Sequence, residues 1–445
     1  MAVITPDEWL PILTKRLDDR YPRMVLLRSY ASNEPPLPEM GENLRASWAA
    51  FQRKACTNYG QLAISSLGRR IKFNGVRVGE SVDSPAAIAV RRVWRDNRMS
   101  IVVADAIENY LTVGVAYLVT GLGSDGAVIA SEQPEQAIAA PDPLRPWKAR
   151  AFLKVWRDLD AGNDYAYVYA AGLRQLYVRS SKDDNGPLRA GSSKGWAGYG
   201  EPEVYVGDPP VVIIERKEGI GFLEPHLSVI DRINLGKLQR LVITAMQAFR
   251  QRGLKGGLPE EDEEGNAIDL KKLFSPAPGA LWDIPEGIEV WESQTADITP
   301  LLAGEKTDAR DFAAVTSTPI SALIPDGANQ SAEGAASAKE GQIAQAEEEL
   351  ERIRPAIEVA LVYALRAEGI DIGAETVELL VVPPAHVSLS ERYDAASKAV
   401  AVQSRKTIQR DILGMSPQQI AEDEADMSLQ QLQAFTLTGG ASGNA

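Results

Sequence analysis

Few residues in this sequence could perform catalysis or hold a metal ion. The chain has one cysteine, Cys56, and two histidines, His226 and His386. A single thiol forms no internal disulfide, which fits synthesis in a reducing compartment. Two histidines far apart in the sequence offer little material for a zinc site or for imidazole chemistry. We therefore expect all three residues to be structural.

The densest charge cluster is a run of consecutive acidic residues: Glu260, Glu261, Asp262, Glu263 and Glu264. Oxygen ligands suit divalent cations, but an EF-hand places its ligands at alternating positions around a glycine. This run has neither the alternation nor the glycine. It is typical of a solvated loop, and we expect no metal ion and no cofactor.

One glycine motif resembles a nucleotide-binding fingerprint. Residues 121–126 read G-x-G-x-x-G, a pattern that binds a dinucleotide only where a strand leads into a helix. Here strand-like residues lie on both sides, so we predict a hairpin turn. The sequence also lacks a phosphate-binding P-loop, a G-x-S-x-G elbow and an H-E-x-x-H helix. These observations argue against an enzyme.

The composition is that of a soluble, acidic protein of more than one structural region. The chain has 445 residues and a formal charge of −14. It contains no apolar run long enough for a membrane span and no visible secretory signal. The negative charge argues against tight nucleic-acid binding by one subunit. It is compatible with a surface past which DNA slides, and equally with plain solubility.

The first half of the chain mixes helices and strands. Capping signals at Thr5, Pro6 and Glu8 predict a helix that reaches about Arg20. Further expectations come from periodicity and turn residues. They are a proline-rich link at 33–38, helices at 43–67 and 103–111, a strand at 114–119, a hairpin at 160–169, a surface loop at 181–200 and a buried strand at 211–214.

The second half begins with two helices that flank an insert. Helical periodicity predicts a helix from Leu227 to Phe249, ended by Gly253, and a Thr299-Pro300 start predicts a second one ending before Pro319. Between them, residues 254–297 are rich in loop residues. Short β-like pieces lie there around Trp282 and Val290-Trp291.

A broken loop and a long helix follow. Residues 318–330 contain two prolines and an apolar tip, too short and too interrupted for a regular element. A helix is predicted at 331–369 with a kink at Pro355. The remaining expectations are a strand at 377–382, a helix from the Ser388 capping box to about Val402, a helix opening at Ser416-Pro417, and a disordered tail at 439–445.

This order of elements resembles the portal proteins of tailed bacteriophages, in the siphophage-type branch common among phages of actinobacteria. The most specific residues are Ala313 to Pro319 followed by Asp326 to Gly334, where a helix ends in a Thr-Pro turn and a loop leads to an Asn-x-Ser-x-Glu helix start. The likeness covers most of the chain. Its other segments are 58–60, 94–99, 384–388, 407–408 and 413–417.

The resemblance implies an α+β portal fold that forms a ring, usually of twelve subunits. Each subunit has an α/β wing, a two-helix stem, a small β-containing clip and a helical crown. On this chain the parts are the wing at 1–225 and 331–386, the stem helices at 226–253 and 298–317, the clip at 254–297, the tunnel loop at 318–330, and the crown with the tail at 387–445.

The resemblance also implies the site residues. The DNA-facing tunnel loop would comprise Thr318, Pro319, Ile320, Ser321, Leu323, Ile324, Asp326, Asn329 and Gln330. Channel-lining stem cations would be Lys237, Arg240, Lys306 and Arg310. The clip residues that bind the adaptor or the terminase would be Glu260, Glu261, Asp262, Glu263, Glu264, Lys271 and Lys272.

The expected partners are other copies of the chain, double-stranded DNA in the channel, the terminase large subunit, an adaptor or head-completion protein, and the major capsid and scaffolding proteins. The expected location is the capsid vertex of the virion, after assembly in the bacterial cytoplasm. No membrane is expected.

Several alternatives stay open at this point. The apolar residues of the tunnel loop would contact either the duplex or neighbouring loops. The stem cations would contact either phosphates or carboxylates of adjacent subunits. A non-portal structural protein associated with the capsid would explain the acidity and the helices, but not their order. A metal-dependent nuclease would need converging carboxylates, for which the sequence offers no signature.

Overall fold

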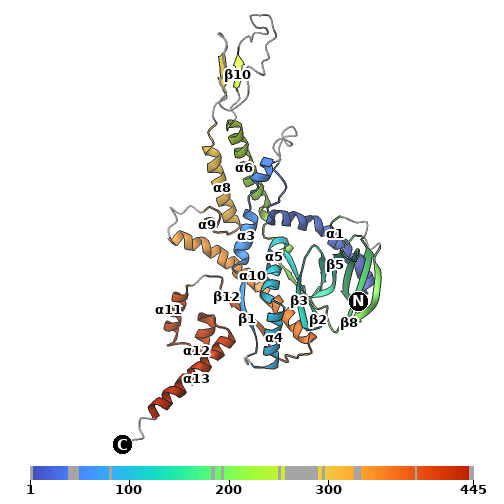
Figure 1. The fold of residues 1–445 in the computed structure, drawn as a ribbon, viewed down its shortest axis with the longest axis vertical. Coiled ribbons are helices and arrows are strands. Elements are labelled where there is room, and N and C mark those ends of the chain that lie inside the picture. Colours follow the sequence, from blue (N-terminus) through green and yellow to red (C-terminus); the bar gives the residue numbers. More distant parts are fainter. Residues whose placement is uncertain are drawn as a thin grey trace. The chain divides into compact units, whose positions relative to one another are not determined.

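We describe the chain from a computed structural model (Figure 1). The structure describes residues 4–38, 50–79, 83–181, 186–191, 195–248, 252–255, 289–292, 296–324, 332–385 and 388–439. Two compact units emerge from the contacts. Unit 1 comprises residues 1–33, 58–227 and 313–445, and unit 2 comprises residues 34–57 and 228–312.

Unit 1 holds most of the helices and three of the sheets. Its helices are α1 (Pro6–Ala31), α3 (Tyr59–Gly68), α4 (Pro85–Asp96), α5 (Met99–Val113), α9 (Ile320–Leu323), α10 (Ala332–Ala367), α11 (Leu389–Ala399), α12 (Arg405–Thr407) and α13 (Pro417–Gly439), with short turns η1 (Lys217–Gly219), η2 (Glu224–His226) and η3 (Ile408–Ile412). Its strands are β1 (Lys72–Val78), β2 (Val115–Gly123), β3 (Gly126–Glu132), β4 (Ala137–Pro141), β5 (Ala149–Asp158), β6 (Asn163–Ala170), β7 (Leu173–Ser180), β8 (Ala197–Val204), β9 (Val211–Glu215) and β12 (Val377–Val382).

Unit 2 is built around two long helices. They are α6 (Leu227–Ala248) and α8 (Thr299–Val315), and the strands β10 (Arg252–Lys255) and β11 (Glu289–Glu292) lie between them in the sequence. Every strand pair within the described ranges is antiparallel. The α+β class expected from the sequence is therefore confirmed.

Helix α1 begins as predicted and ends later than predicted. The backbone amide of Thr5 donates to the Glu8 carboxylate at 2.8 Å, which completes the expected start. The helix does not stop near Arg20, because the apolar side that packs into the core continues through Met24 and Leu27, which are 0% and 2% exposed. Burial of these side chains outweighs the helix-weakening effect of an internal proline, Pro22.

A five-stranded sheet forms the larger β layer, in the order β4-β5-β6-β7-β8. One of its faces packs against α1 and buries Leu153, Val155 and Val168. The β5–β6 hairpin confirms the turn predicted around 160–164, and Asp158 caps it by accepting from the amide of Ala161 at 2.9 Å. The loop predicted at 181–200 is partly wrong, because Ala197 onward pairs with β7 as strand β8.

The glycine motif at 121–126 is a hairpin, as predicted. Strands β2 and β3 pair up to Gly123 and Gly126, which leaves Ser124 and Asp125 as a two-residue turn. Gly126 has a φ of +131°, a conformation that side-chain-bearing residues rarely adopt. Strand β9 adds to the other edge of β2, and its predicted buried residues, Val211 to Ile214, are at most 6% exposed.

The helix predicted at 43–67 is interrupted. Residues 50–55 are helical and α3 begins at Tyr59, whereas residues 43–49 lie outside the described residues. The break falls at Thr57, whose backbone amide donates to the side-chain oxygen of Asn234 at 3.0 Å and so leaves the helical pattern. Just after it, a Cβ at Gly60 would lie 2.6 Å from the carbonyl oxygen of Tyr30. Only glycine fits this approach.

Helix α10 crosses unit 1 and buries its second half, as the apolar pattern predicts. Ile357, Leu361 and Leu365 are completely buried. The helix continues through Pro355 from Ala332 to Ala367. The predicted strand at 377–382 is observed as β12, which pairs with β1.

The C-terminal helices start where the sequence places them. The Ser388 hydroxyl accepts from the amide of Glu391 at 3.2 Å, and Ser416 accepts from the amide of Gln419 at 3.3 Å. Helix α11 ends at Ala399, three residues before the predicted end. Residues 440–445 of the predicted disordered tail lie outside the described residues. None of the helices in the described ranges has the length and apolarity that crossing a membrane requires.

The first testable prediction concerns the buried carboxylate of Asp164, on β6. Its side chain is 1% exposed and pairs with Arg157 at 2.7 Å and with Arg179 at 3.0 Å. Asp164→Ala deprives two largely buried guanidiniums of their shared carboxylate, so we expect the free energy of unfolding to fall by about 3 kcal/mol or more. Urea titration followed by circular dichroism measures this loss.

The matched control for this prediction is Asp160→Ala, at an exposed position of the same hairpin. We expect it to change the free energy of unfolding by less than about 0.5 kcal/mol. Equal losses in the two variants would contradict the role assigned to Asp164.

Candidate functional site

The His, Cys, Asp and Glu side chains of the described residues are the first candidates for a functional site. No group of three or more His, Cys, Asp or Glu side chains is placed to hold a metal ion in the part of the chain that the structure describes. Cys56 is half-buried with its thiol pKa raised by burial, and His226 ends the short turn η2. His386, like residues 260–264, 271 and 272, lies outside the described residues. The candidate site therefore rests on shape and charge.

Helices α6 and α8 form an antiparallel pair within unit 2 (Figure 1). Ion pairs and a hydrogen bond join residue 232 to residues 308 and 311, residue 240 to residue 305, and residue 247 to residue 296. The two segments therefore run in opposite directions. Apolar side chains recur at helical spacing on their inner sides and are buried. These are Ile230, Ile233, Leu238 and Ala309, each at most 2% exposed.

Ion pairs also join α6 to α8. Arg240 Nε lies 2.6 Å from Glu305, and Arg232 lies 2.8 Å from Asp308 and 2.7 Å from Asp311. Arg240 was predicted to line a channel and contact phosphates or another subunit. The structure instead pairs it with a carboxylate of its own chain. A cation engaged in this way is less available to DNA.

The acidic partners on α8 were not identified from the sequence. Glu305, Asp308 and Asp311 recur every three residues, which places them on one side of the helix. This three-residue spacing is the one feature of the sequence that could have identified them. It predicts ion pairs only when the opposing cations of α6 are known, and these lie more than sixty positions away in the sequence.

The four predicted stem cations differ in their surroundings. Arg240 is 29% exposed, and Lys237 is half-buried on α6. Burial lowers the pKa of Lys237, Glu305 opposes this by raising it, and Arg240 lowers it further. Lys306 and Arg310 are exposed on α8. The predicted set is thus not one continuous cationic surface.

Between α6 and α8 in the sequence, two short strands pair with each other. Strand β10 pairs with β11 from Arg252 opposite Glu292 to Lys255 opposite Glu289. The β-like piece predicted at Val290-Trp291 is confirmed, and Trp282 lies outside the described residues. The first stem helix was predicted to extend to residue 253. It is observed as far as Ala248, residues 249–251 lie outside the described residues, and from Arg252 the chain is extended because its backbone groups pair with β11.

Helix α8 ends in a tight turn at Ser317. The amide of Thr318 donates to the carbonyl oxygen of Ala313 at 3.0 Å, and Ser317 has a φ of +50°. This is the Schellman pattern, with serine where glycine is usual. Pro319 then precedes the single turn α9, where the sequence predicted no regular element.

The start of the predicted DNA-facing loop is largely buried, which corrects part of that prediction. Thr318 and Leu323 are only 3% and 7% exposed, and Pro319 is buried as well. Leu323 faces inward because α9 packs against α3. Ile320 and Ile324 are half-buried, and only Ser321 among these residues is exposed. Asp326, Asn329 and Gln330 lie outside the described residues.

Comparisons with known proteins find likeness in structure only. No family model matches the sequence, and no curated protein matches it. Among solved structures, the neck of a native gene transfer agent particle, computed with C12 symmetry, is 12% identical, with a TM-score of 0.45 over 88% of this chain and 99% of that chain. The neck of the empty particle, computed with C6 symmetry, is 13% identical, with a TM-score of 0.46 over 88% and 100%. A chain of the native virion is 13% identical, with a TM-score of 0.43 over 88% and 99%.

The second prediction concerns Lys237. Because burial lowers its pKa in the folded protein, the charged ammonium is less stable there than in the unfolded chain. This penalty is fully present below the folded pKa and disappears above the unfolded value of about 10.4. Lys237→Met should therefore raise the unfolding temperature at pH 7, and the gain should shrink as the pH approaches 10. Differential scanning calorimetry at several pH values measures it.

Lys306→Met is the control for this experiment, because Lys306 is an exposed lysine of the same helix pair. No pH-dependent gain is expected from it. A loss of stability in Lys237→Met at pH 7 would show that the ammonium stabilises the fold.

Proposed function

We propose that this chain is a portal subunit of a tailed bacteriophage or phage-like particle. Copies of it would form a ring at one capsid vertex, through which double-stranded DNA enters and leaves. The observation that carries the proposal is the insertion of unit 2 into unit 1. The chain leaves unit 1 after Leu227 and returns to unit 1 at Ala313. Between these two points, helices α6 and α8 flank the paired strands β10 and β11 in the sequence.

The order of the elements matches the parts that such a ring requires. Helices α6 and α8 would be the stem, and the insert that begins with β10 and ends with β11 would be the clip. Unit 1 would supply the wing through its sheets and α10, and the crown through α11 to α13. Residues 318–330 would be the tunnel loop, with its first part anchored by buried Leu323.

The charges of the helix pair suit the passage of DNA. A duplex binds tightly where many free cations meet its phosphates. Here Arg232 and Arg240 are held by carboxylates of α8, and the whole chain carries a charge of −14. The pairing of these two arginines would weaken the attraction of the stem for DNA, and contacts to phosphates would carry no sequence preference.

The proposed partners follow from the same assignment. The clip would bind an adaptor or head-completion protein and, during packaging, the terminase large subunit. The wing would meet the major capsid and scaffolding proteins. The ring would act as a passive channel with no catalytic residue and no cofactor, and its location would be the virion after assembly in the host cytoplasm.

The test of the proposed function is the assembly state of the purified full chain. Rings with a central opening by electron microscopy, and a mass near twelve subunits by light scattering, are expected. Because one subunit has a mass of 48.2 kDa, a ring and a monomer are easily separated. A stable monomer or dimer at all salt concentrations would overturn the portal proposal and favour a capsid-associated structural protein.

A further inference from the structure

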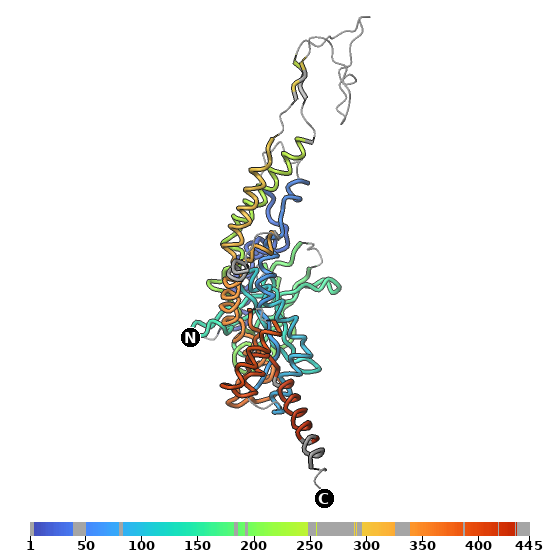
Figure 2. Tube along the Cα trace, turned by 90° about the vertical axis from the view of Figure 1, so that its left-hand side faces the viewer, coloured from blue at the N-terminus to red at the C-terminus, as the bar shows by residue number. Residues whose placement is uncertain are grey.

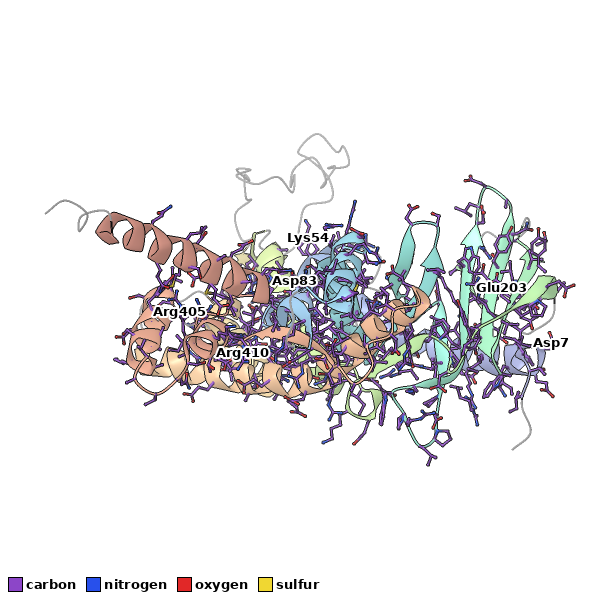
Figure 3. The ribbon with its side chains drawn as sticks, turned by 90° about the horizontal axis from the view of Figure 1, so that it is seen from below. Asp7, Lys54, Asp83, Glu203, Arg405 and Arg410 are labelled. Carbon is purple, nitrogen blue, oxygen red and sulfur yellow. The ribbon has the colours of Figure 1, made fainter. Side chains whose placement is uncertain are left out.

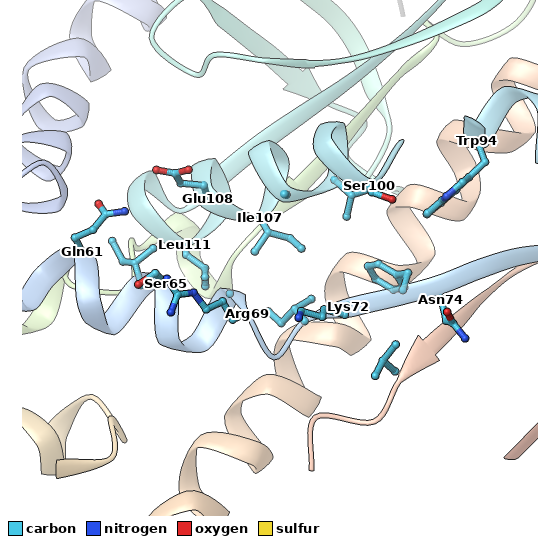
Figure 4. Close-up of a pocket in the computed structure, with 17 residues that line it drawn as sticks. Gln61, Ser65, Arg69, Lys72, Asn74, Trp94, Ser100, Ile107, Glu108 and Leu111 are labelled. Carbon is cyan, nitrogen blue, oxygen red and sulfur yellow. The ribbon is translucent and has the colours of Figure 1, made fainter. Parts of the chain in front are cut away.

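An apolar groove opens on unit 1 between α3, β1 and α5 (Figure 4). It encloses about 570 Å³ and has a largely apolar lining, to which Ile64, Val103 and Ile107 contribute. Phe73 and Trp94 in its wall are only half-buried. Apolar surface of this kind on a soluble protein usually marks a place where another surface binds.

Two cations, Arg69 and Lys72, and one carboxylate, Glu108, are the charged residues in the lining of this groove. Arg69, just after α3, and Lys72, the first residue of β1, are both exposed, and Figure 4 shows them next to each other at the groove. Neither has an ion-pair partner among the described residues. The surrounding segment is unusual for an acidic protein. Residues 59–113 contain eight Lys and Arg against five Asp and Glu, a net charge of +3.

The opposite charge lies on the outer side of α10. Glu340, Glu347 and Glu351 are exposed, and in the described part of the chain none of them has a cationic partner. Spacings of seven and four residues place them in one stripe about 16 Å long. Ala344 lies within the stripe and is small enough to let a second surface approach. Residues 332–367 contain seven Asp and Glu against four Lys and Arg, a net charge of −3.

The groove and the acidic stripe face away from each other. Figures 2 and 3 show α10 on one broad side of unit 1 and the helices α3, α4 and α5 on the other. The inner sides of α5 and α10 meet through a hydrogen bond that the buried Tyr110 hydroxyl donates to Glu349. Their exposed residues therefore point outward in different directions, and the stripe cannot reach the groove of its own chain.

We infer that the groove of one subunit binds the acidic stripe of α10 from a second copy of this chain. Arg69 and Lys72 meet Glu347 and Glu351, and Ala344 lies over the apolar lining. The occupant is a second copy because the same chain displays both complementary surfaces. An isologous dimer would oppose like charges, stripe to stripe or groove to groove. Only a head-to-tail contact pairs them, and repetition of such a contact generates a ring.

This inference deepens the proposed function, because it names the surfaces through which the ring would close. It depends on the proposal only in requiring that the chain assembles with itself. Contacts between unpaired opposite charges at such an interface speed association and select the correct partner. They also make assembly weaker at high salt.

A charge exchange tests the interface in the full-length protein. The variant Arg69→Glu/Lys72→Glu and the variant Glu347→Lys/Glu351→Lys each place like charges in contact. Each should weaken assembly at least about tenfold, as the subunit concentration needed for half-assembly measured by light scattering. Combining all four substitutions restores opposite charges, and assembly should recover. Circular dichroism checks that each variant is folded.

The control is Asp125→Lys/Asp160→Lys, which makes the same change in net charge as Glu347→Lys/Glu351→Lys, but at two exposed hairpin turns. It should assemble like the unmodified chain. If the unmodified chain forms rings and neither pair of substitutions weakens them, the inferred interface is wrong and the portal proposal stands. If both pairs weaken assembly and the combination does not restore it, the pairing of groove with stripe is wrong. If the unmodified chain stays monomeric, both proposals fail together.

Discussion

The packing of α10 into unit 1 depends on the buried carboxylate of Glu349. Glu349 enters the interior on α10 with 4% of its surface exposed, and it accepts hydrogen bonds from the Tyr110 hydroxyl of α5 and from Arg216 at 2.8 Å. Burial and the neighbouring carboxylate raise the pKa of Tyr110, so this phenol stays protonated and remains a donor. A buried charge without such partners would destabilise the fold by several kcal/mol. Because the Glu349 carboxylate needs both partners, α10 must lie next to Tyr110 of α5 and next to Arg216, which follows β9.

The position of α10 has consequences on both of its sides. Its inner side completes the core through Ile357 and Leu361, and so holds the strands β2 and β9. Its outer side is left with exposed carboxylates that find no cation in the described part of their own chain. The same helix is thus both the centre of unit 1 and one of its charged surfaces. The head-to-tail assembly inferred above would use this division, because the unpaired carboxylates of one subunit would meet the cations of the next.

Unit 2 has partly exposed ion pairs between its two helices, where unit 1 has a buried carboxylate. Its two helices bury a narrow apolar strip and are joined by ion pairs at their edges, such as Arg240 with Glu305. Partly exposed pairs of this kind contribute little stability each, but they fix the register of the two helices. They also neutralise the guanidiniums of Arg232 and Arg240.

The sequence alone determined the elements whose signals are local. Capping residues at Thr5 and Ser388, the glycine turn at 121–126 and the largely apolar, valine-rich run at 377–382 act over a few positions, so the starts of these helices and the strands could be predicted. Only the tertiary structure decided the rest. The extension of α1, the break at Thr57, the pairing of Arg240 and the burial of Leu323 each depend on residues tens to hundreds of positions away. Such contacts form only when the chain is folded, because burial and ion pairing require both partners to be present.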